Sequence, residues 1–164
     1  MGKELKTNAM RILDRNKIPY EIIQYECDTF IDGVHTAEKT GAPVAQSFKT
    51  LVMRGKSGQH YVFVIPVAAE VDLKAAARAA GEKAIEMLPV KDITAVTGYV
   101  RGGCSPLGMK KQFPAIVQET AASYDKIYIS GGRIGTSITV APDALLSVIH
   151  GVYADVIRHD APAP

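Results

Sequence analysis

The most chemically suggestive residues lie in a glycine-rich segment in the middle of the chain. Gly98, Gly102, Gly103 and Gly108 fall within eleven residues. Ordering a glycine costs about 0.5 to 1 kcal/mol more than ordering an alanine, so such a density predicts unusual backbone angles or a ligand held against the main chain. Backbone N–H groups in a loop of this kind can stabilise a developing oxyanion without any catalytic side chain.

Two side chains in this segment are candidate nucleophiles, and the sequence supports neither strongly. The run around Ser105 resembles a nucleophile elbow, but Leu107 stands where that motif requires its closing glycine. An acid and a histidine follow Ser105 in the order of a triad, although any chain of this length offers such pairs; they are Asp143, Asp155, His150 and His159. Cys104 has only Arg101 nearby in sequence to lower the pKa of its thiol, so a small buried side chain is the simpler interpretation.

Metal and phosphate chemistry also lack a convincing pattern. None of the four histidines pairs with another histidine or a cysteine at zinc-ligand spacing. The glycines in residues 130–135 do not match either common phosphate-binding fingerprint, and β-branched residues follow where a helix should begin. We therefore expect a glycine turn after a strand at this point, and no metal or cofactor in the protein.

The composition limits the class of protein. The chain has 164 residues, of which 47% are hydrophobic and 22% charged, with a formal net charge of +2. These values predict one folded domain over residues 1–164, with its core at about 7–160, and exclude a disordered chain or a histone-like DNA coat. No apolar run approaches the roughly 20 residues of a membrane span, and the first residues do not read as a secretory signal. We expect a cytoplasmic protein with reduced thiols.

The elements that must position these residues are short strands interleaved with short helices. Strands are predicted over residues 20–25, 48–54, 60–66, 84–87, 115–118, 126–130, 137–140 and 152–157. Helices are predicted over residues 7–16, 35–39, 72–80, 90–96 and 142–149. Because the order lacks regular βαβ spacing, we expect an α+β fold with a mixed, mostly antiparallel, barrel-like sheet surrounded by short helices.

Several segments together resemble one known family. They are Lys49-Thr-Leu-Val52, Pro66 followed by residues 71–74, and residues 97–111, 127–132 and 154–158. In their order and content they resemble the YbaK/EbsC-type Cys-tRNA(Pro) deacylases, free-standing relatives of the editing domain of bacterial prolyl-tRNA synthetases. The resemblance spans residues 12–160, and the glycine-rich segment is its most specific part.

The resemblance implies a trans-editing hydrolase that removes cysteine from mischarged tRNA(Pro). Cysteine and proline are similar in size, and small apolar differences give only about 10- to 200-fold discrimination, so a second site must destroy the error. The implied mechanism uses the substrate's own thiol to attack its ester and form a thiolactone. The implied partners are the aminoacylated 3′ end of tRNA(Pro) and a ternary complex with prolyl-tRNA synthetase.

The resemblance also assigns roles to particular residues. Lys49 would be an electrostatic anchor for the terminal adenosine or the ester, and Gly102 and Gly103 would offer backbone contacts to the carbonyl. The expected substrate-binding residues are Tyr25, Phe30, Thr50, Ser105, Pro106, Ser130 and Ser137. The expected tRNA contacts, where the small basic surplus should cluster, are Arg101, Lys110, Lys111 and Arg133.

Two positions depart from the family pattern and leave alternatives open. Relatives often carry a basic residue at the position of Ile134, and commonly an acidic or other polar group at the position of Ser137. A lost carboxylate would remove a partner for the substrate's ammonium group, so the enzyme could instead clear Ala-tRNA(Pro) or another small amino acid. A second alternative is a non-catalytic module that binds a tRNA end or a synthetase.

Overall fold

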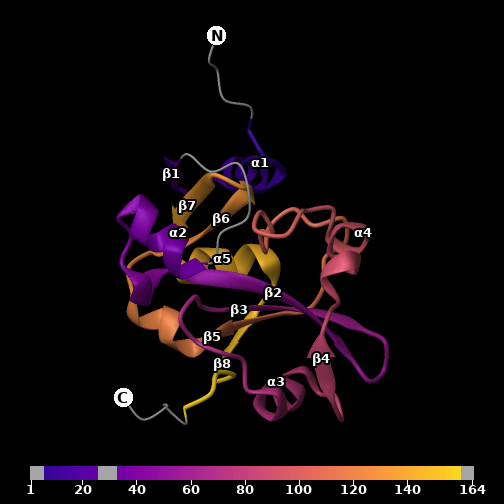
Figure 1. The fold of residues 1–164 in the computed structure, drawn as a ribbon. Coiled ribbons are helices and arrows are strands. Elements are labelled where there is room, and N and C mark those ends of the chain that lie inside the picture. Colours follow the sequence, from indigo (N-terminus) through magenta and orange to yellow (C-terminus); the bar gives the residue numbers. More distant parts are fainter. Residues whose placement is uncertain (1–5, 26–32, 160–164) are drawn as a thin grey trace.

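The strands form two sheets in the computed structural model, which describes residues 6–25 and 33–159. The five-stranded sheet has the order β4-β2-β3-β5-β8 (Figure 1). Its strands are β2 (Phe48–Gly55), β3 (His60–Pro66), β4 (Ile85–Met87), β5 (Ala115–Gln118) and β8 (Val152–Ala154). The three-stranded sheet has the order β1-β7-β6 and consists of β1 (Glu21–Gln24), β6 (Ile127–Arg133) and β7 (Thr136–Val140).

Strand β3 is the centre of the larger sheet and separates two apolar clusters. It pairs antiparallel with β2 on one edge and parallel with β5 on the other. Because side chains alternate along a strand, Val62 and Val64 face one cluster, and Phe63 and Ile65 face the other. A strand that is buried on both faces must be apolar throughout, which explains the unbroken run of apolar residues from Tyr61 to Ile65.

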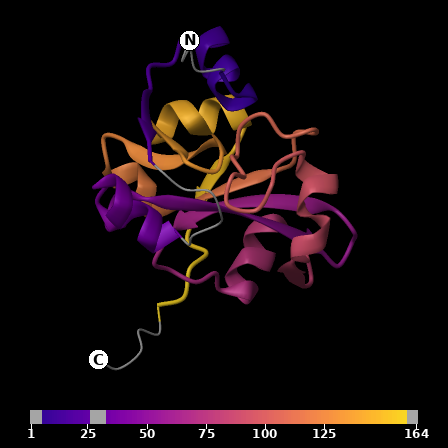
Figure 2. The same ribbon diagram turned by 45° about the horizontal axis from the view of Figure 1, so that its top comes forward.

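Helices cover both faces of the larger sheet (Figure 2). Helices α1 (Asn8–Arg15) and α5 (Pro142–Ile149) pack into the cluster that contains Val62 and Val64. Helix α3 (Leu73–Ala80) packs into the opposite cluster. The remaining helices are α2 (Gly33–Thr40), α4 (Ile93–Thr97) and the 3₁₀ turns η1 (Val44–Gln46), η2 (Val90–Asp92) and η3 (Glu119–Ser123).

The ends of the helices follow from local sequence signals. Thr7 caps α1 by accepting a hydrogen bond from the Met10 amide, and Asp72 caps α3 in the same way through the Ala75 amide. Gly81 ends α3 in the left-handed region with φ 77°. Helix α5 ends at His150, which adopts φ 54° although it is not a glycine.

The predicted α+β class is confirmed, and the sheet differs from the prediction in one respect. The strands divide between two sheets instead of one barrel-like sheet. An isolated bridge joins Ser47, directly before β2, to Tyr128 of β6. Two strands also differ from the prediction by three residues at their C-terminal ends. β6 continues past Ser130 through an irregular pairing to Arg133, and β8 ends at Ala154, before the predicted residue 157. Within the described ranges, no helix is both long and apolar enough to span a bilayer.

Candidate active site

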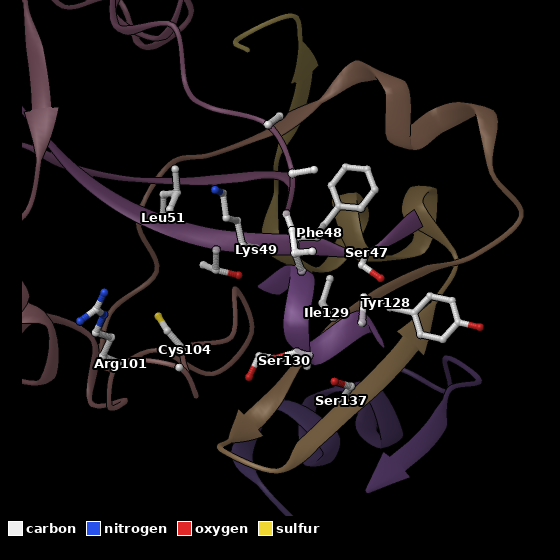
Figure 3. A pocket seen from close by; sticks show the side chains of 18 of the residues that line it. Ser47, Phe48, Lys49, Leu51, Arg101, Cys104, Tyr128, Ile129, Ser130 and Ser137 are labelled. Carbon is white, nitrogen blue, oxygen red and sulfur yellow. The ribbon is translucent and has the colours of Figure 1, made fainter. Parts of the chain in front are cut away.

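A cavity of about 600 Å³ lies beside the first half of β2 (Figure 3). Its walls come from β2, from β6 and β7 of the smaller sheet, and from α2. The segments between β3 and α3 and between β4 and α4, and the glycine-rich loop that follows α4, complete the lining. The cavity therefore lies where both sheets and the loop meet, and no single sequence segment forms it.

The cavity follows an edge of β2 that no strand of the described residues pairs with at Thr50. Strand β4 pairs with β2 only from Met53 to Gly55, and the Leu88 amide then donates to the Val52 carbonyl oxygen. Because backbone groups alternate between the two edges of a strand, the amide and carbonyl of Thr50 point to the same edge as those of Val52. This edge can hydrogen-bond an extended ligand, as exposed strand edges commonly do.

Side chains from both faces of β2 reach the cavity because it wraps around this edge. Thr50 pairs with Val64 and Lys49 pairs with Ile65, two residues that face opposite apolar clusters. Figure 3 shows the result: Lys49 and Leu51 project from one side of β2, and Arg101, Cys104, Ser130 and Ser137 lie on the other. The cavity thus has a hydroxyl-rich side and a side with the Lys49 ammonium group.

The hydroxyl oxygen of Thr50 is buried and has no hydrogen-bond partner. An unsatisfied buried polar group costs about 1 to 3 kcal/mol, and buried side-chain hydroxyls in folded proteins are usually paired. Thr50 also lines the cavity. An unpaired hydroxyl at the wall of a cavity is a group that a ligand can satisfy.

The glycine-rich loop is held in place by direct backbone packing. A Cβ atom on Gly103 would lie 2.9 Å from the Arg133 Cα and 3.0 Å from the Ile134 nitrogen, in the turn between β6 and β7. The Gly103 amide donates to the Val100 carbonyl oxygen at 2.9 Å. Gly102 has φ 87° and lines the cavity. Gly102 is therefore the glycine of this pair that a substrate can reach, while Gly103 holds the loop against the smaller sheet.

Ser105 and Pro106 shape the loop and do not line the cavity. Ser105 is fully buried, and its hydroxyl oxygen accepts a hydrogen bond from the Leu107 amide at 3.3 Å. Further along the loop, the Tyr99 hydroxyl donates to the Leu107 carbonyl oxygen at 2.6 Å. This enclosure leaves Ser105 without access to a bound ester, which argues against the nucleophile that a triad would need.

Cys104 lines the cavity, but its thiol is not activated. Burial raises the pKa of the Cys104 thiol to about 11. The thiol is therefore protonated at neutral pH, and a protonated thiol is a poor nucleophile. Cys104 is therefore an uncharged residue in the wall of the cavity.

Cationic groups outnumber carboxylates among the described residues of the lining. Lys49 and Arg101 contribute two positive charges, and Glu70 is the carboxylate. The Glu70 oxygen lies 3.3 Å from the Arg158 guanidinium, which offsets its charge. An anionic group, such as a phosphate or a developing oxyanion, is favoured in such a site. In residues 6–25 and 33–159, no group of three or more His, Cys, Asp or Glu residues could hold a metal ion.

The structure brings together about half of the site residues expected from the sequence. Those that line the cavity are Tyr25, Lys49, Thr50, Arg101, Gly102, Ser130 and Ser137. Those that do not are Gly103, Ser105, Pro106, Lys110, Lys111 and Arg133. Phe30 lies outside the described residues.

The three basic residues outside the cavity have local contacts. Lys110 donates to the Ala95 carbonyl oxygen at 3.3 Å, and the Lys111 ammonium lies 6.0 Å from the centre of the Phe113 ring. The Arg133 guanidinium donates to the Thr136 hydroxyl oxygen at 3.2 Å. None of the three lines the cavity.

Sequence reasoning missed much of the apolar wall. Val34 and Ala37 of α2 and Leu88 after β4 carry no motif, and only the folded topology brings them to the cavity. Tyr128 could have been predicted from the sequence, because side chains alternate along a strand and Tyr128 therefore lies on the same face of β6 as the predicted Ser130.

Comparisons with known proteins identify the family and the fold of this chain. Residues 32–148 match the aminoacyl-tRNA editing domain family. An Enterococcus faecalis protein, provisionally named Cys-tRNA(Pro)/Cys-tRNA(Cys) deacylase EbsC, is 44% identical over 152 residues, which cover 92% of this chain and 93% of that protein.

Two solved structures share the fold. One, described as a candidate trans-editing enzyme for prolyl-tRNA synthetase, is 24% identical with a TM-score of 0.79, covering 94% of this chain and 99% of that one. The other, described only as a hypothetical protein, is 21% identical with a TM-score of 0.85, covering 93% of this chain and 100% of that one.

Proposed function

The chain belongs to the aminoacyl-tRNA editing domain family, and from that premise we propose that it is a trans-editing hydrolase that removes cysteine from mischarged tRNA(Pro). The 44% identical relative, whose provisional name assigns it deacylation of Cys-tRNA(Pro) and Cys-tRNA(Cys), supports this reaction class. The proposed place of action is the cytoplasm, where tRNA is charged.

The observation that carries the proposal is the unpaired hydroxyl of Thr50 inside a cavity that also contains Lys49 and Gly102. A bound aminoacyl ester offers a carbonyl and an amine that can pair with Thr50 and with the open edge of β2. The nearby Gly102 backbone can contact the ester oxygen as negative charge develops on it. We assign the aminoacyl group to the hydroxyl-rich side of β2.

Lys49 faces the other side of β2 and is suited to the RNA portion of the substrate. Its ammonium group attracts the phosphate of the terminal nucleotide or the oxygen that leaves the ester. The substrate then straddles the open edge of β2, with its amino acid on one side and its terminal adenosine on the other. This arrangement orients the ester and shields it from bulk water.

The proposed nucleophile is the thiol of the cysteinyl group itself. Its sulfur attacks the ester carbonyl carbon, the bond to the ribose oxygen breaks, and the thiol proton ends on that oxygen. The products are free tRNA and a four-membered thiolactone, which water opens to cysteine. Well-oriented intramolecular attack contributes about 7 to 11 kcal/mol toward lowering a barrier. The neutral Cys104 and the enclosed Ser105 are consistent with a nucleophile supplied by the substrate.

We also propose that the enzyme acts in a ternary complex with prolyl-tRNA synthetase. The formal net charge of +2 is too small for strong binding to RNA phosphates over a large surface. A partner that already holds the tRNA would supply that affinity and the choice of tRNA.

A deacylation assay tests the proposal directly. The protein is incubated with tRNA(Pro) carrying cysteine, alanine or serine, and loss of each ester is followed. Preferential loss of cysteine over serine is expected, because a hydroxyl is a far weaker nucleophile than a thiol. Preferential loss of alanine would replace the thiol mechanism with clearance of another small amino acid. No turnover of any of the three would leave a module that binds the tRNA end or the synthetase.

A further inference from the structure

Two exposed apolar side chains line the cavity, and a third directly precedes a lining residue in the chain. Six large apolar side chains are exposed among the described residues, and Met87 and Val90, at 46% and 55% exposure, line the cavity. Val100, at 51% exposure, directly precedes Arg101 of the lining. Met87, Val90 and Val100 together are called the apolar rim below. Apolar side chains that cluster on a surface mark contact sites more often than scattered ones do.

The apolar rim residues lie at the end of β4, in η2 and in the loop after α4. Met87 ends β4, and Val90 begins η2 directly after Pro89. The Thr94 hydroxyl in α4 donates to the Tyr99 carbonyl oxygen at 3.0 Å, which ties the helix to the residue before Val100. Gly98 turns the chain between them with φ 86°. The segment that leads into Val100 is thus tied to α4.

Basic residues border the apolar rim. Arg101 lines the cavity, Lys91 follows Val90 and is exposed, and the Lys110 ammonium donates to the Ala95 carbonyl oxygen of α4. The nearby Glu86 carboxylate contacts the Arg54 guanidinium at 2.8 Å, which offsets its charge. Unpaired RNA presents apolar base faces together with phosphates, so a surface of apolar and basic side chains complements it.

We propose that the apolar rim contacts the bases of the unpaired nucleotides at the 3′ end of the RNA substrate, with Lys91 near their phosphates. The inference rests on the proposed function, because it places those nucleotides at the mouth of the cavity that receives the ester. It adds that the protein reads the RNA end through contact with bases. A protein of nearly balanced charge can then hold an RNA end without a broad basic surface.

The test compares two pairs of substitutions with matched exposure. Met87→Ser with Val90→Ser alters the rim, while Leu73→Ser with Val152→Ser alters side chains of 48% and 54% exposure that do not line the cavity. Binding is measured with a labelled RNA hairpin that carries a short unpaired 3′ tail and with the same hairpin without the tail. Turnover is measured with the tailed hairpin carrying cysteine and with cysteine ethyl ester, which has no nucleotide.

The rim variant should raise the Kd and KM for the tailed RNA about tenfold, with kcat changed by less than about twofold. It should leave the ethyl ester and the tail-less hairpin unaffected, and the control variant should match the wild type throughout. Unchanged Kd and KM for the tailed RNA would overturn the inference while leaving the hydrolase intact. Equal weakening for both hairpins would also overturn it.

Two further outcomes separate the inference from the proposed function. If no ester is hydrolysed but the rim variant still binds the tailed RNA more weakly, the proposed hydrolase function is rejected and RNA contact at the apolar rim is supported. If sedimentation shows that the wild type self-associates and the rim variant does not, the rim is an interface between copies of this chain, and RNA contact at the rim is rejected.

Discussion

Gly103 and Arg133 approach each other so closely that a Cβ atom on Gly103 would lie 2.9 Å from the Arg133 Cα. The two residues are far apart in sequence, and their contact fixes the glycine-rich loop against the turn between β6 and β7. The opposing atoms belong to the backbone and cannot move aside as the end of a flexible side chain would. The position of Gly102 at the cavity therefore depends on the absence of a side chain one residue later.

Gly103→Ala should therefore displace the loop. Overpacking of this kind costs about 1 to 3 kcal/mol, so we expect a lower free energy of unfolding in urea. The same variant should lose at least about tenfold in kcat/KM for Cys-tRNA(Pro), because Gly102 moves with the loop.

Gly58→Ala is the matched control for this substitution. Gly58 lies in the turn between β2 and β3 with φ 94° and open space around its Cα, so alanine there strains the backbone without a clash. It should lower stability and leave kcat/KM unchanged. Wild-type stability and activity in Gly103→Ala would show that the loop tolerates the extra atom.

Lys49→Ala should slow deacylation strongly while the protein stays folded. Removing a group that stabilises developing charge typically costs about 100- to 1000-fold in rate, and we expect a loss in kcat/KM of that order for Cys-tRNA(Pro). Lys74→Ala, an exposed lysine on α3, is the control and should behave as the wild type. Unchanged deacylation by a folded Lys49→Ala protein would remove Lys49 from the mechanism.

Local sequence signals predicted most helices and strands of this fold, but they could not predict the contacts between segments far apart in sequence. The ends of α3 were readable because Asp72 and Gly81 are a strong cap and a strong stop. The hairpin of β2 and β3 was readable because two β-rich runs flank a short glycine-containing turn. The division into two sheets was not predictable from local signals, since it depends on contacts between segments far apart in sequence, such as the bridge between Ser47 and Tyr128.

The candidate site was only partly predictable, because its lining also depends on contacts between segments far apart in sequence. A glycine-rich segment indicates a special loop, but its sequence does not say that Gly102 reaches the cavity while Gly103 packs on Arg133. Nor does it say that Lys49 and Thr50, which lie on opposite faces of β2, both line one cavity. Both facts depend on which edge of β2 is left unpaired.

Cys104 should be unreactive at neutral pH and dispensable for deacylation. Burial raises the pKa of its thiol to about 11, so alkylation by iodoacetamide at pH 7 should be slow and should accelerate as the pH rises toward that value. Peptide mapping separates Cys104 from Cys27, the other cysteine of the chain. Cys104→Ala should retain kcat/KM within about threefold of the wild type, because a neutral wall residue contributes mainly packing. Rapid alkylation at pH 7 with loss of activity would instead identify a reactive thiol.

The raised pKa of Cys104 also predicts how stability depends on pH. The group binds its proton more tightly in the folded protein than in the unfolded chain, whose thiol has its ordinary pKa near 9.0. Its contribution to stability is fully present below that pH and is lost as the pH rises from there through about 11. Cys104→Ala should lose less stability than the wild type over that interval, as measured by urea unfolding at each pH. Identical pH dependence in the two proteins would contradict the buried, protonated thiol.

Thr50→Val should separate stability from function. The substitution keeps the shape of the side chain and removes a buried hydroxyl that has no hydrogen-bond partner. The free energy of unfolding should stay the same or rise by up to about 1 to 3 kcal/mol, because the cost of the unpaired group disappears. Deacylation should weaken by about tenfold in kcat/KM, the value of one hydrogen bond to the substrate.

Thr139→Val is the matched control for Thr50→Val, because the buried Thr139 hydroxyl is already paired: its oxygen accepts from the Glu21 amide at 3.1 Å. Valine there should lower the free energy of unfolding by about 1 to 3 kcal/mol, since the amide loses its partner. It should leave kcat/KM unchanged, since Thr139 does not line the cavity. The two variants thus differ in both measurements: the free energy of unfolding falls only in Thr139→Val, and kcat/KM falls only in Thr50→Val. A Thr50→Val protein that loses stability and keeps full activity would show that this hydroxyl supports the fold and does not meet the substrate.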